Sequence, residues 1–396
     1  MDRRSLLSAA LAAPLAVAPT ATLFAPAVAR AQAAASSGSR TEWRVDGSEG
    51  QDAIAFWGPL SGRELYTRYY AADVELFAPR LPPDIREAVP ALWQAAEGDG
   101  VGLLSPNLAL LLSHAGRDRT LDDVIAALAD PEASMGAAFR AGPYWNEGDW
   151  GWFVGKAGRI RSVFEAMRVA DFAGFRRERA GAALEAGVRR LRDSLPAFDV
   201  IRVEEKLTGR TFDPAIEITA LHFSKPHGIK VRGQRFLQSH EYDVANTVRI
   251  AAHELLHPPV PMDGPAATAA LEVLARDPLI PLIVSEHDPR WGYTTLEGML
   301  NEDLCQALDQ MVSEAMGVAR NPADRWRLSD DGMHVLAAGL YGLLRQDRWS
   351  RSGGSIEPWL LAAAEGGRLS PAVLHPAAAR VLERPVDRLW PLTDDS

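Results

Sequence analysis

The hydrophobic residues of this chain follow two different periods, and the change between them limits the folds that are open to it. From about residue 52 to residue 200, apolar side chains recur at spacings of three and four, which is the pattern of helices that bury one face. The period changes to two between about residues 200 and 240, and the helical pattern then returns. Helices, a small sheet and further helices predict a mostly helical α+β protein with two lobes.

Clusters of proline and glycine divide these patterns into separate segments. Residues 215–223 and 229–232 alternate with a Lys-Pro-His-Gly turn between them, so they predict a hairpin or two neighbouring strands. A helix is expected from about residue 243 to His257, where two prolines stop it. The other predicted helices are residues 64–77, 85–96, 121–128, 160–169, 180–195, 266–276, 295–319 and 332–345, with shorter pieces near 357–364 and 371–383.

Residues 1–33 have the order of an export signal, with a charged start, an apolar middle and small residues at the end. Arg3 and Arg4, followed by two leucines, resemble the twin-arginine export signal. Three prolines interrupt the apolar part, which leaves no run of about 20 apolar residues that would anchor the chain in a membrane. We therefore expect residues 1–33 to be cleaved off as a signal, so that the product is periplasmic or secreted and not stably inserted in a membrane. Residues 34–50 are expected to form a flexible leader.

The charge and the cysteine content bear on nucleic-acid binding and on disulfide formation. The formal net charge of −10 argues against a nucleic-acid partner, because binding phosphates requires basic patches. The single cysteine, Cys305, excludes an internal disulfide.

One motif carries recognisable chemistry. The sequence His253-Glu254-Leu255-Leu256-His257 places two histidines four residues apart on the predicted helix, so both rings project from one face and can share one Zn²⁺ ion. Glu254 lies one residue round the helix, where its carboxylate can reach a water without binding the metal. A catalytic zinc site takes three protein ligands and keeps one position open, so one further ligand is expected.

The segment 298–302, Gly-Met-Leu-Asn-Glu, lies on the next long predicted helix and resembles the Gly-x-x-Asn-Glu segment of the thermolysin-like gluzincins. This resemblance implies a zincin-like core, with the small sheet before the active-site helix and a helical C-terminal lobe. It also implies that Glu302 is the third zinc ligand and that Tyr293, nine residues earlier, helps to stabilise an oxyanion. The family uses a late histidine in a similar role, for which His334 is the candidate here. Gln306 stands where the family has an aspartate that orients a histidine.

Two other acids compete with Glu302 for the third position. Asp263 lies six residues after His257, where the metzincins carry a ligand, but Val260 replaces the glycine of their turn. Glu297 lies five residues before Glu302, and that step turns a helical position away from the same face.

The chain is therefore expected to divide into the signal (1–33), the leader (34–50), a helical N-terminal region (51–200) and a zincin-like catalytic region (201–396). In the last, residues 201–260 would hold the sheet and the motif helix, and residues 261–396 the helical lobe. The resemblance implies an exported zinc metallopeptidase that acts on a peptide or protein, with Glu254 as the general base. Two alternatives stay open: a zinc-stabilised binding protein without turnover, and a zinc amidase that acts on a non-peptide or cell-wall substrate.

Overall fold

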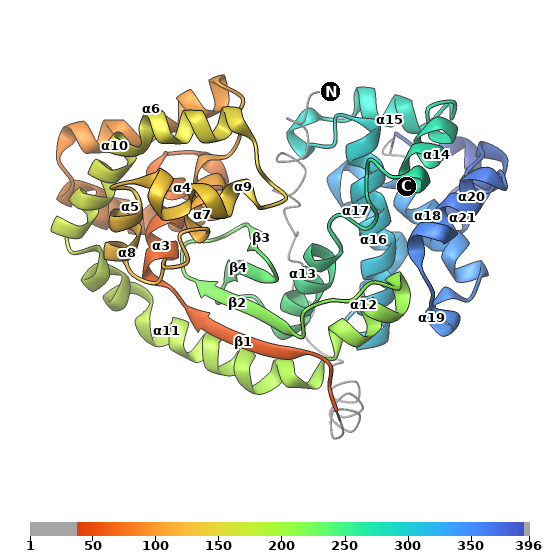
Figure 1. Cartoon of the computed structure of the whole chain (residues 1–396), viewed down its shortest axis with the longest axis horizontal. Helices are drawn as coiled ribbons and strands as arrows, with labels where there is room; N and C mark the ends of the chain where they lie inside the picture. Colours follow the sequence, from red (N-terminus) through yellow and green to blue (C-terminus); the bar gives the residue numbers. More distant parts are fainter. Residues whose placement is uncertain (1–37, 392–396) are drawn as a thin grey trace. The chain divides into compact units, whose positions relative to one another are not determined.

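The computed structural model describes residues 38–391, which form two compact units. Within these residues, the first unit contains 43–194 and 216–243, and the second contains 38–42, 195–215 and 244–391. The predicted export signal lies outside the described residues. The prediction of a mostly helical α+β protein is confirmed, since one small mixed sheet accompanies many helices (Figure 1).

The sheet has four strands in the order β1-β2-β4-β3. Strand β2 (Ala215–Leu221) pairs in parallel with β4 (Arg235–Ser239), and β3 (Gly228–Arg232) pairs with β4 in the antiparallel sense. The expectation of a hairpin or of neighbouring strands at 215–223 and 229–232 was therefore wrong, because β4 lies between them. Strand β4 escaped prediction because its Arg-Phe-Leu-Gln-Ser sequence does not alternate cleanly between apolar and polar residues.

Strand β1 (Glu42–Gly47) overturns part of the predicted leader. Thr41 and Val45 are buried and Trp43 is half-buried, whereas Glu42 and Arg44 between them are exposed. This short alternation places one face of the strand against the core, and the Ala- and Ser-rich residues before it hid the pattern. Residues 42–50 thus belong to the folded protein.

Helices and an aromatic core make up the rest of the first unit. Phe56 lies against Phe77, Phe172, Phe175 and Phe223, with ring centroids 4.4 to 5.9 Å apart. Aromatic pairs at such separations add to the stabilisation that burial itself provides. The helices are α3 (Glu49–Ala55), α4 (Trp57–Leu60), α5 (Glu64–Phe77), α6 (Pro83–Gly98), α7 (Leu104–Ser113), α8 (Leu121–Ala127), α9 (Ala137–Arg140), α10 (Glu147–Val169) and α11 (Phe172–Ser194).

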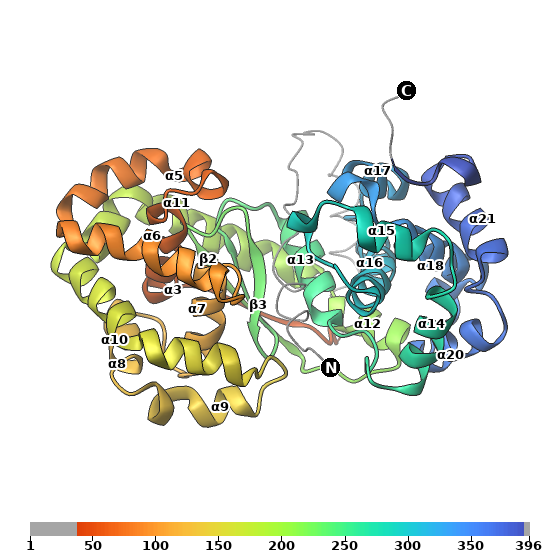
Figure 2. The same ribbon diagram turned by 90° about the horizontal axis from the view of Figure 1, so that it is seen from above.

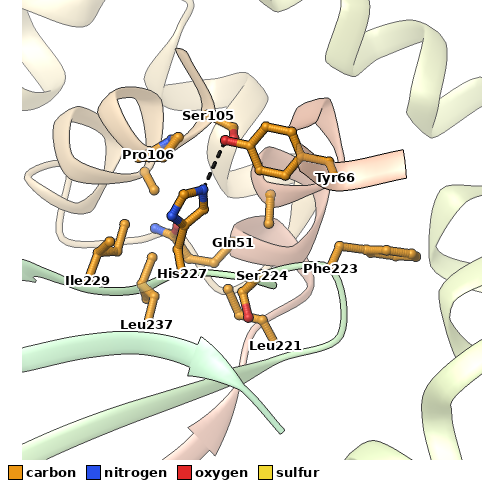
Figure 3. A pocket seen from close by; sticks show the side chains of 12 residues that line it. Gln51, Tyr66, Ser105, Pro106, Leu221, Phe223, Ser224, His227, Ile229 and Leu237 are labelled. Carbon is orange, nitrogen blue, oxygen red and sulfur yellow. Dashed lines mark hydrogen bonds between the residues drawn. The ribbon is translucent and has the colours of Figure 1, made fainter. Parts of the chain in front are cut away.

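A small cavity of about 30 Å³ lies within this core, enclosed mainly by apolar side chains (Figure 3). The hydroxyl of Tyr66 lies 3.0 Å from Nε2 of His227 at its wall. Burial lowers the pKa of His227 to about 4, so the ring is neutral at pH 7. The space suits about one ordered water and is too small for an organic substrate.

The second unit is built around α16 (Leu296–Met316), whose residues 298–313 are all buried. This helix packs against α12 (Val200–Thr208), α13 (Val244–Leu256), α14 (Pro265–Leu274), α15 (Ile280–Glu286) and α18 (Val335–Gln346), as Figure 2 shows from above. The remaining helices are α17 (Pro322–Leu328), α19 (Trp349–Ser352), α20 (Ile356–Glu365) and α21 (Pro371–Leu382). Among the described helices, none has the length and apolar character needed to cross a membrane.

The boundaries between the two units differ from the single boundary expected near residue 200. The sheet residues 216–243 belong with the N-terminal helices, whereas the motif helix α13 belongs to the second unit. The predicted helices themselves are present, and α10 and α11 begin 13 and 8 residues earlier than the sequence pattern indicated for 160–169 and 180–195.

Candidate metal centre

The two motif histidines lie at the C-terminal end of α13. His253 is in the last turn, and His257 follows directly after Leu256, where the helix ends as the proline at 258 predicted. The guanidinium of Arg210 donates hydrogen bonds to the carbonyl oxygens of Leu256 and Pro258, at 3.2 and 2.7 Å. Arg210 therefore fixes the end of the helix and the segment that carries His257.

Glu302 approaches both histidines from α16, which packs against α13. Nε2 of His253 lies 3.0 Å from Nε2 of His257, and the two nitrogens lie 3.5 and 3.4 Å from the oxygens of Glu302. Donor atoms bound tetrahedrally at about 2.0–2.2 Å from one zinc ion lie roughly 3.3–3.6 Å apart. The two nitrogen–oxygen distances match this spacing, and the two histidine nitrogens lie about 0.3 Å closer together than its lower end.

The surroundings of Glu302 also fit a metal ion. Its side chain is 1% exposed, and among the described residues its Oε2 atom has no hydrogen-bond partner. A buried carboxylate oxygen that accepts no hydrogen bond is costly, and a bound cation would satisfy it together with the nearby His257 ring. The side chain of His253 is 21% exposed, so the site keeps contact with solvent on this side. These features suit a site with an open coordination position.

A partly buried ion pair orients His253. Nδ1 of His253 lies 2.8 Å from Oδ2 of Asp309, a residue two turns beyond Glu302 on α16. Asp309 in turn accepts hydrogen bonds from both terminal nitrogens of the Arg325 guanidinium, one of them at 2.9 Å. A carboxylate on the outer nitrogen fixes the ring and leaves Nε2 as the basic, metal-binding atom. No motif in the sequence marks Asp309, because it lies seven residues beyond Glu302 and the resemblance directs attention to Gln306.

His257 is oriented by weaker partners. Its Nδ1 lies 3.3 Å from Sγ of Cys305 and 3.4 Å from Oδ1 of Asn301. Burial raises the pKa of the Cys305 thiol well above its usual value, so Cys305 stays a neutral thiol. Both contacts are to the outer ring nitrogen, and Nε2 again faces Glu302.

Gln306 supports the ligand carboxylate. Its amide nitrogen donates a hydrogen bond of 2.9 Å to Oε1 of Glu302, and its oxygen accepts one of 2.8 Å from the indole of Trp326. The amide is therefore oriented by a buried side chain before it contacts Glu302. Gln306 therefore holds the Glu302 carboxylate in place.

The charges of the site favour a cation at its centre. Burial alone would lower the pKa of His253, but the carboxylates of Glu302 and Asp309 outweigh it and raise the pKa to about 9. Burial would raise the pKa of Glu302, but the two histidines outweigh it and hold the pKa well below its usual range. The carboxylates thus stabilise positive charge at the point where the three side chains meet.

Tyr293 and Glu254 lie close to this point. Burial raises the pKa of Tyr293 well above its usual value, and the neighbouring carboxylates of Glu302 and Glu254 contribute to the shift. The hydroxyl of Tyr293 therefore stays protonated and can donate a hydrogen bond. Tyr293 also has a φ of 57°, a left-handed conformation that costs a bulky residue roughly 1–2 kcal/mol. Such strain is common at functional sites, where the surrounding fold maintains it.

His334 occupies a different environment from the one expected of a proton donor. It is completely buried, with Nδ1 2.6 Å from Asp303 and Nε2 3.1 Å from Asp330. Burial would lower its pKa, but the two carboxylates raise it to about 10, so the ring carries a positive charge. Its ring centroid lies 5.9 Å from that of Tyr293. The arrangement makes His334 a buried cation behind Tyr293.

The alternative third ligands lie elsewhere. Asp263 and Glu297 are exposed, and neither belongs to the group of ligand atoms formed by His253, His257 and Glu302. The structure thus brings together the three candidate metal ligands named from the sequence, and places Tyr293 beside them. Asp303, Asp309 and Arg325 were missed because they lie far in the sequence from the histidines they serve, and Asp330 was missed although it stands only four residues before His334.

Comparison of the chain with protein-family models, with curated proteins and with solved structures gives no match.

Proposed function

We propose that this protein is an exported, zinc-dependent hydrolase, and specifically a metallopeptidase with a zincin-like core. The observation that carries the proposal is the triangle formed by Nε2 of His253, Nε2 of His257 and the carboxylate of Glu302, with edges of 3.0 to 3.5 Å. Two histidines and one glutamate are a ligand set of catalytic zinc in peptidases, whereas structural zinc sites are usually closed by four protein ligands.

A zinc ion held there would polarise a substrate carbonyl and acidify a water molecule. The residues of the chain account for the proton transfers. The carboxylate of Glu254, directly after His253 on α13, accepts a proton from the attacking water and returns it to the leaving amine. The Tyr293 hydroxyl, which its raised pKa keeps protonated, donates a hydrogen bond to the oxyanion that forms on the carbonyl oxygen.

The position of Glu254 favours catalysis over a purely structural metal. Its side chain is close enough to both His253 and Tyr293 to raise the pKa of each. A structural site has no need of a further carboxylate beside its ligands. An exported peptide or protein hydrolase also accords with the signal-like residues 1–33.

The substitution Glu254→Gln tests the proposal, with Glu297→Gln as the matched control on an exposed glutamate. We expect Glu254→Gln to keep its zinc and to lower the turnover of casein and of a fluorogenic peptide library by about 10²–10⁴-fold. Glu297→Gln should keep both zinc and turnover. Equal rates for Glu254→Gln and the parent protein would exclude this mechanism.

The choice of substrate separates the proposal from its alternatives. Cleavage of peptidoglycan fragments with none of casein would favour the amidase. A zinc-loaded parent protein that cleaves neither would favour a binding protein without turnover.

A further inference from the structure

A second group of metal-binding side chains lies in the first unit, at the ends of two neighbouring strands. His222 follows β2 directly and His240 follows β4. The strands are parallel with Leu221 opposite Ser239, and the amide of His240 donates a hydrogen bond of 2.9 Å to the carbonyl of Leu221. Because carboxyl ends of parallel strands meet at one edge of a sheet, the two histidines become neighbours although 18 residues separate them.

We propose that His222, His240 and Glu241 form a second binding site for a divalent transition metal such as Zn²⁺. Nδ1 of His222 lies 3.3 Å from Nε2 of His240, with the two rings stacked at an angle of 29°. One carboxylate oxygen of Glu241 completes a group of ligand atoms that all lie within 4.8 Å of one another. The distance between the nitrogens is that expected of two ligands on one tetrahedral ion, roughly 3.3 Å. Imidazole and carboxylate donors are a set that suits zinc, copper and nickel.

The backbone around the two histidines is held firmly. Buried Asp52 accepts hydrogen bonds from the amides of His222 and Phe223, at 2.7 and 3.0 Å. On the other strand, the guanidinium of Arg190 donates to the carbonyls of His240 and Tyr242, at 2.7 and 3.0 Å. Both ligand-bearing segments are therefore positioned before any ion binds, which lowers the entropic cost of binding.

The residue His240 packs closely against α11. A Cβ atom added at Gly187 would lie 2.6 Å from the His240 carbonyl oxygen and 3.2 Å from its Nδ1. Glycine inside a helix costs roughly 1 kcal/mol relative to alanine, so this close packing offsets an intrinsic disadvantage.

Lys225 competes with the ion for Glu241. Its ammonium nitrogen lies 2.5 Å from Oε2 of Glu241, whose side chain is 46% exposed. A cation at the site would share this carboxylate with Lys225, so removal of the ammonium group should strengthen metal binding. If Lys225 and Glu241 form only a surface ion pair and no metal site exists, no gain in metal affinity is expected.

The experiment counts metal ions bound to the full chain after removal of metal by a chelator and reloading with Zn²⁺. The parent protein should bind two ions per chain, one for each group of ligands, and Glu302→Gln should retain the ion in the first unit. Glu241→Gln should lower the affinity for that ion at least about tenfold, and Lys225→Met should raise it. Glu217→Gln, a matched change at an exposed glutamate of β2, should have no effect.

Loading with Co²⁺ gives an independent readout, because its visible spectrum reports nitrogen ligands. Glu302→Gln loaded with Co²⁺ should show a spectrum that His222→Asn abolishes in the same background. Glu241→Gln keeps the test decisive if His222→Asn fails to fold, since residue 241 is exposed. A single ion per parent chain, lost with Glu302→Gln, would overturn the proposal, as would unchanged affinity in both Glu241→Gln and Lys225→Met.

Discussion

Oδ2 of Asp309 lies 2.8 Å from Nδ1 of His253 and also accepts a hydrogen bond of 2.9 Å from the guanidinium of Arg325. This relationship links a proposed metal ligand on α13 to two residues on α16 and α17. The chain Arg325–Asp309–His253 fixes the orientation of the ring and the nitrogen that faces Glu302. The geometry of the proposed zinc site therefore depends on residues that do not contact the metal.

The substitution Asp309→Asn should lower the affinity for zinc by about 10- to 100-fold, because the amide no longer supports the basic form of His253. Competition with a zinc-binding dye measures this directly. Asp324→Asn is the matched control, since Asp324 is an exposed aspartate that pairs with Arg327. Equal zinc affinities for Asp309→Asn and Asp324→Asn would show that Asp309 does not support zinc binding through His253.

Tyr293 should act on turnover and not on metal binding. The substitution Tyr293→Phe removes only the hydroxyl, and we expect kcat to fall by roughly 10²-fold while KM and zinc content change little. Tyr69→Phe, at an exposed tyrosine of the first unit, provides the control. A loss confined to KM would show that Tyr293 binds substrate and does not stabilise an oxyanion.

His334 should matter for stability. The substitution His334→Gln leaves Asp303 and Asp330 buried without their shared cation, which should destabilise the protein by about 3–5 kcal/mol. Arg327→Gln breaks a partly exposed ion pair and should cost less than about 1 kcal/mol. Denaturant unfolding of the two variants tests the difference. Full stability in His334→Gln, together with loss of turnover, would instead favour the catalytic role first expected of this residue.

The pair of Asp277 and His375 should make stability depend on pH. Burial would raise the pKa of Asp277, but hydrogen bonds from His375 and from the amides of Leu279 and Ile280 outweigh it and lower the pKa. Because the folded pKa lies below the unfolded value of about 3.9, the carboxylate stabilises the fold above that pH. This contribution is lost as the pH falls through the folded pKa.

Comparison of the parent protein with Asp277→Asn tests this sign. The difference in free energy of unfolding should be largest near pH 7, at roughly 1–3 kcal/mol, and should shrink below about pH 4. A difference that grows as the pH falls would contradict the assignment.

Much of the second unit could be predicted from the sequence because its signals are local. The four-residue spacing placed His253 and His257 on one helix face, and the Gly-x-x-Asn-Glu segment singled out Glu302. The spacing of apolar residues located α13 and α16, although residues 298–313 of α16 are buried on every side and not on one face alone.

The remaining features depend on contacts between distant parts of the chain. Asp309 orients His253 across 56 residues, and Asp303 meets His334 across 31, with no short-range pattern to mark either pair. The insertion of β4 between β2 and β3 likewise depends on pairing partners, which alternation within one strand does not reveal.

The central claim is that His253, His257 and Glu302 bind one zinc ion between them. Anomalous X-ray scattering at the zinc absorption edge, measured on crystals of the zinc-loaded protein, tests it most directly. The account predicts a zinc peak at about 2.0–2.2 Å from Nε2 of each histidine and from an oxygen of Glu302. Zinc-loaded crystals with no peak between these three side chains, or with the Glu302 carboxylate turned away from the ion, would contradict it.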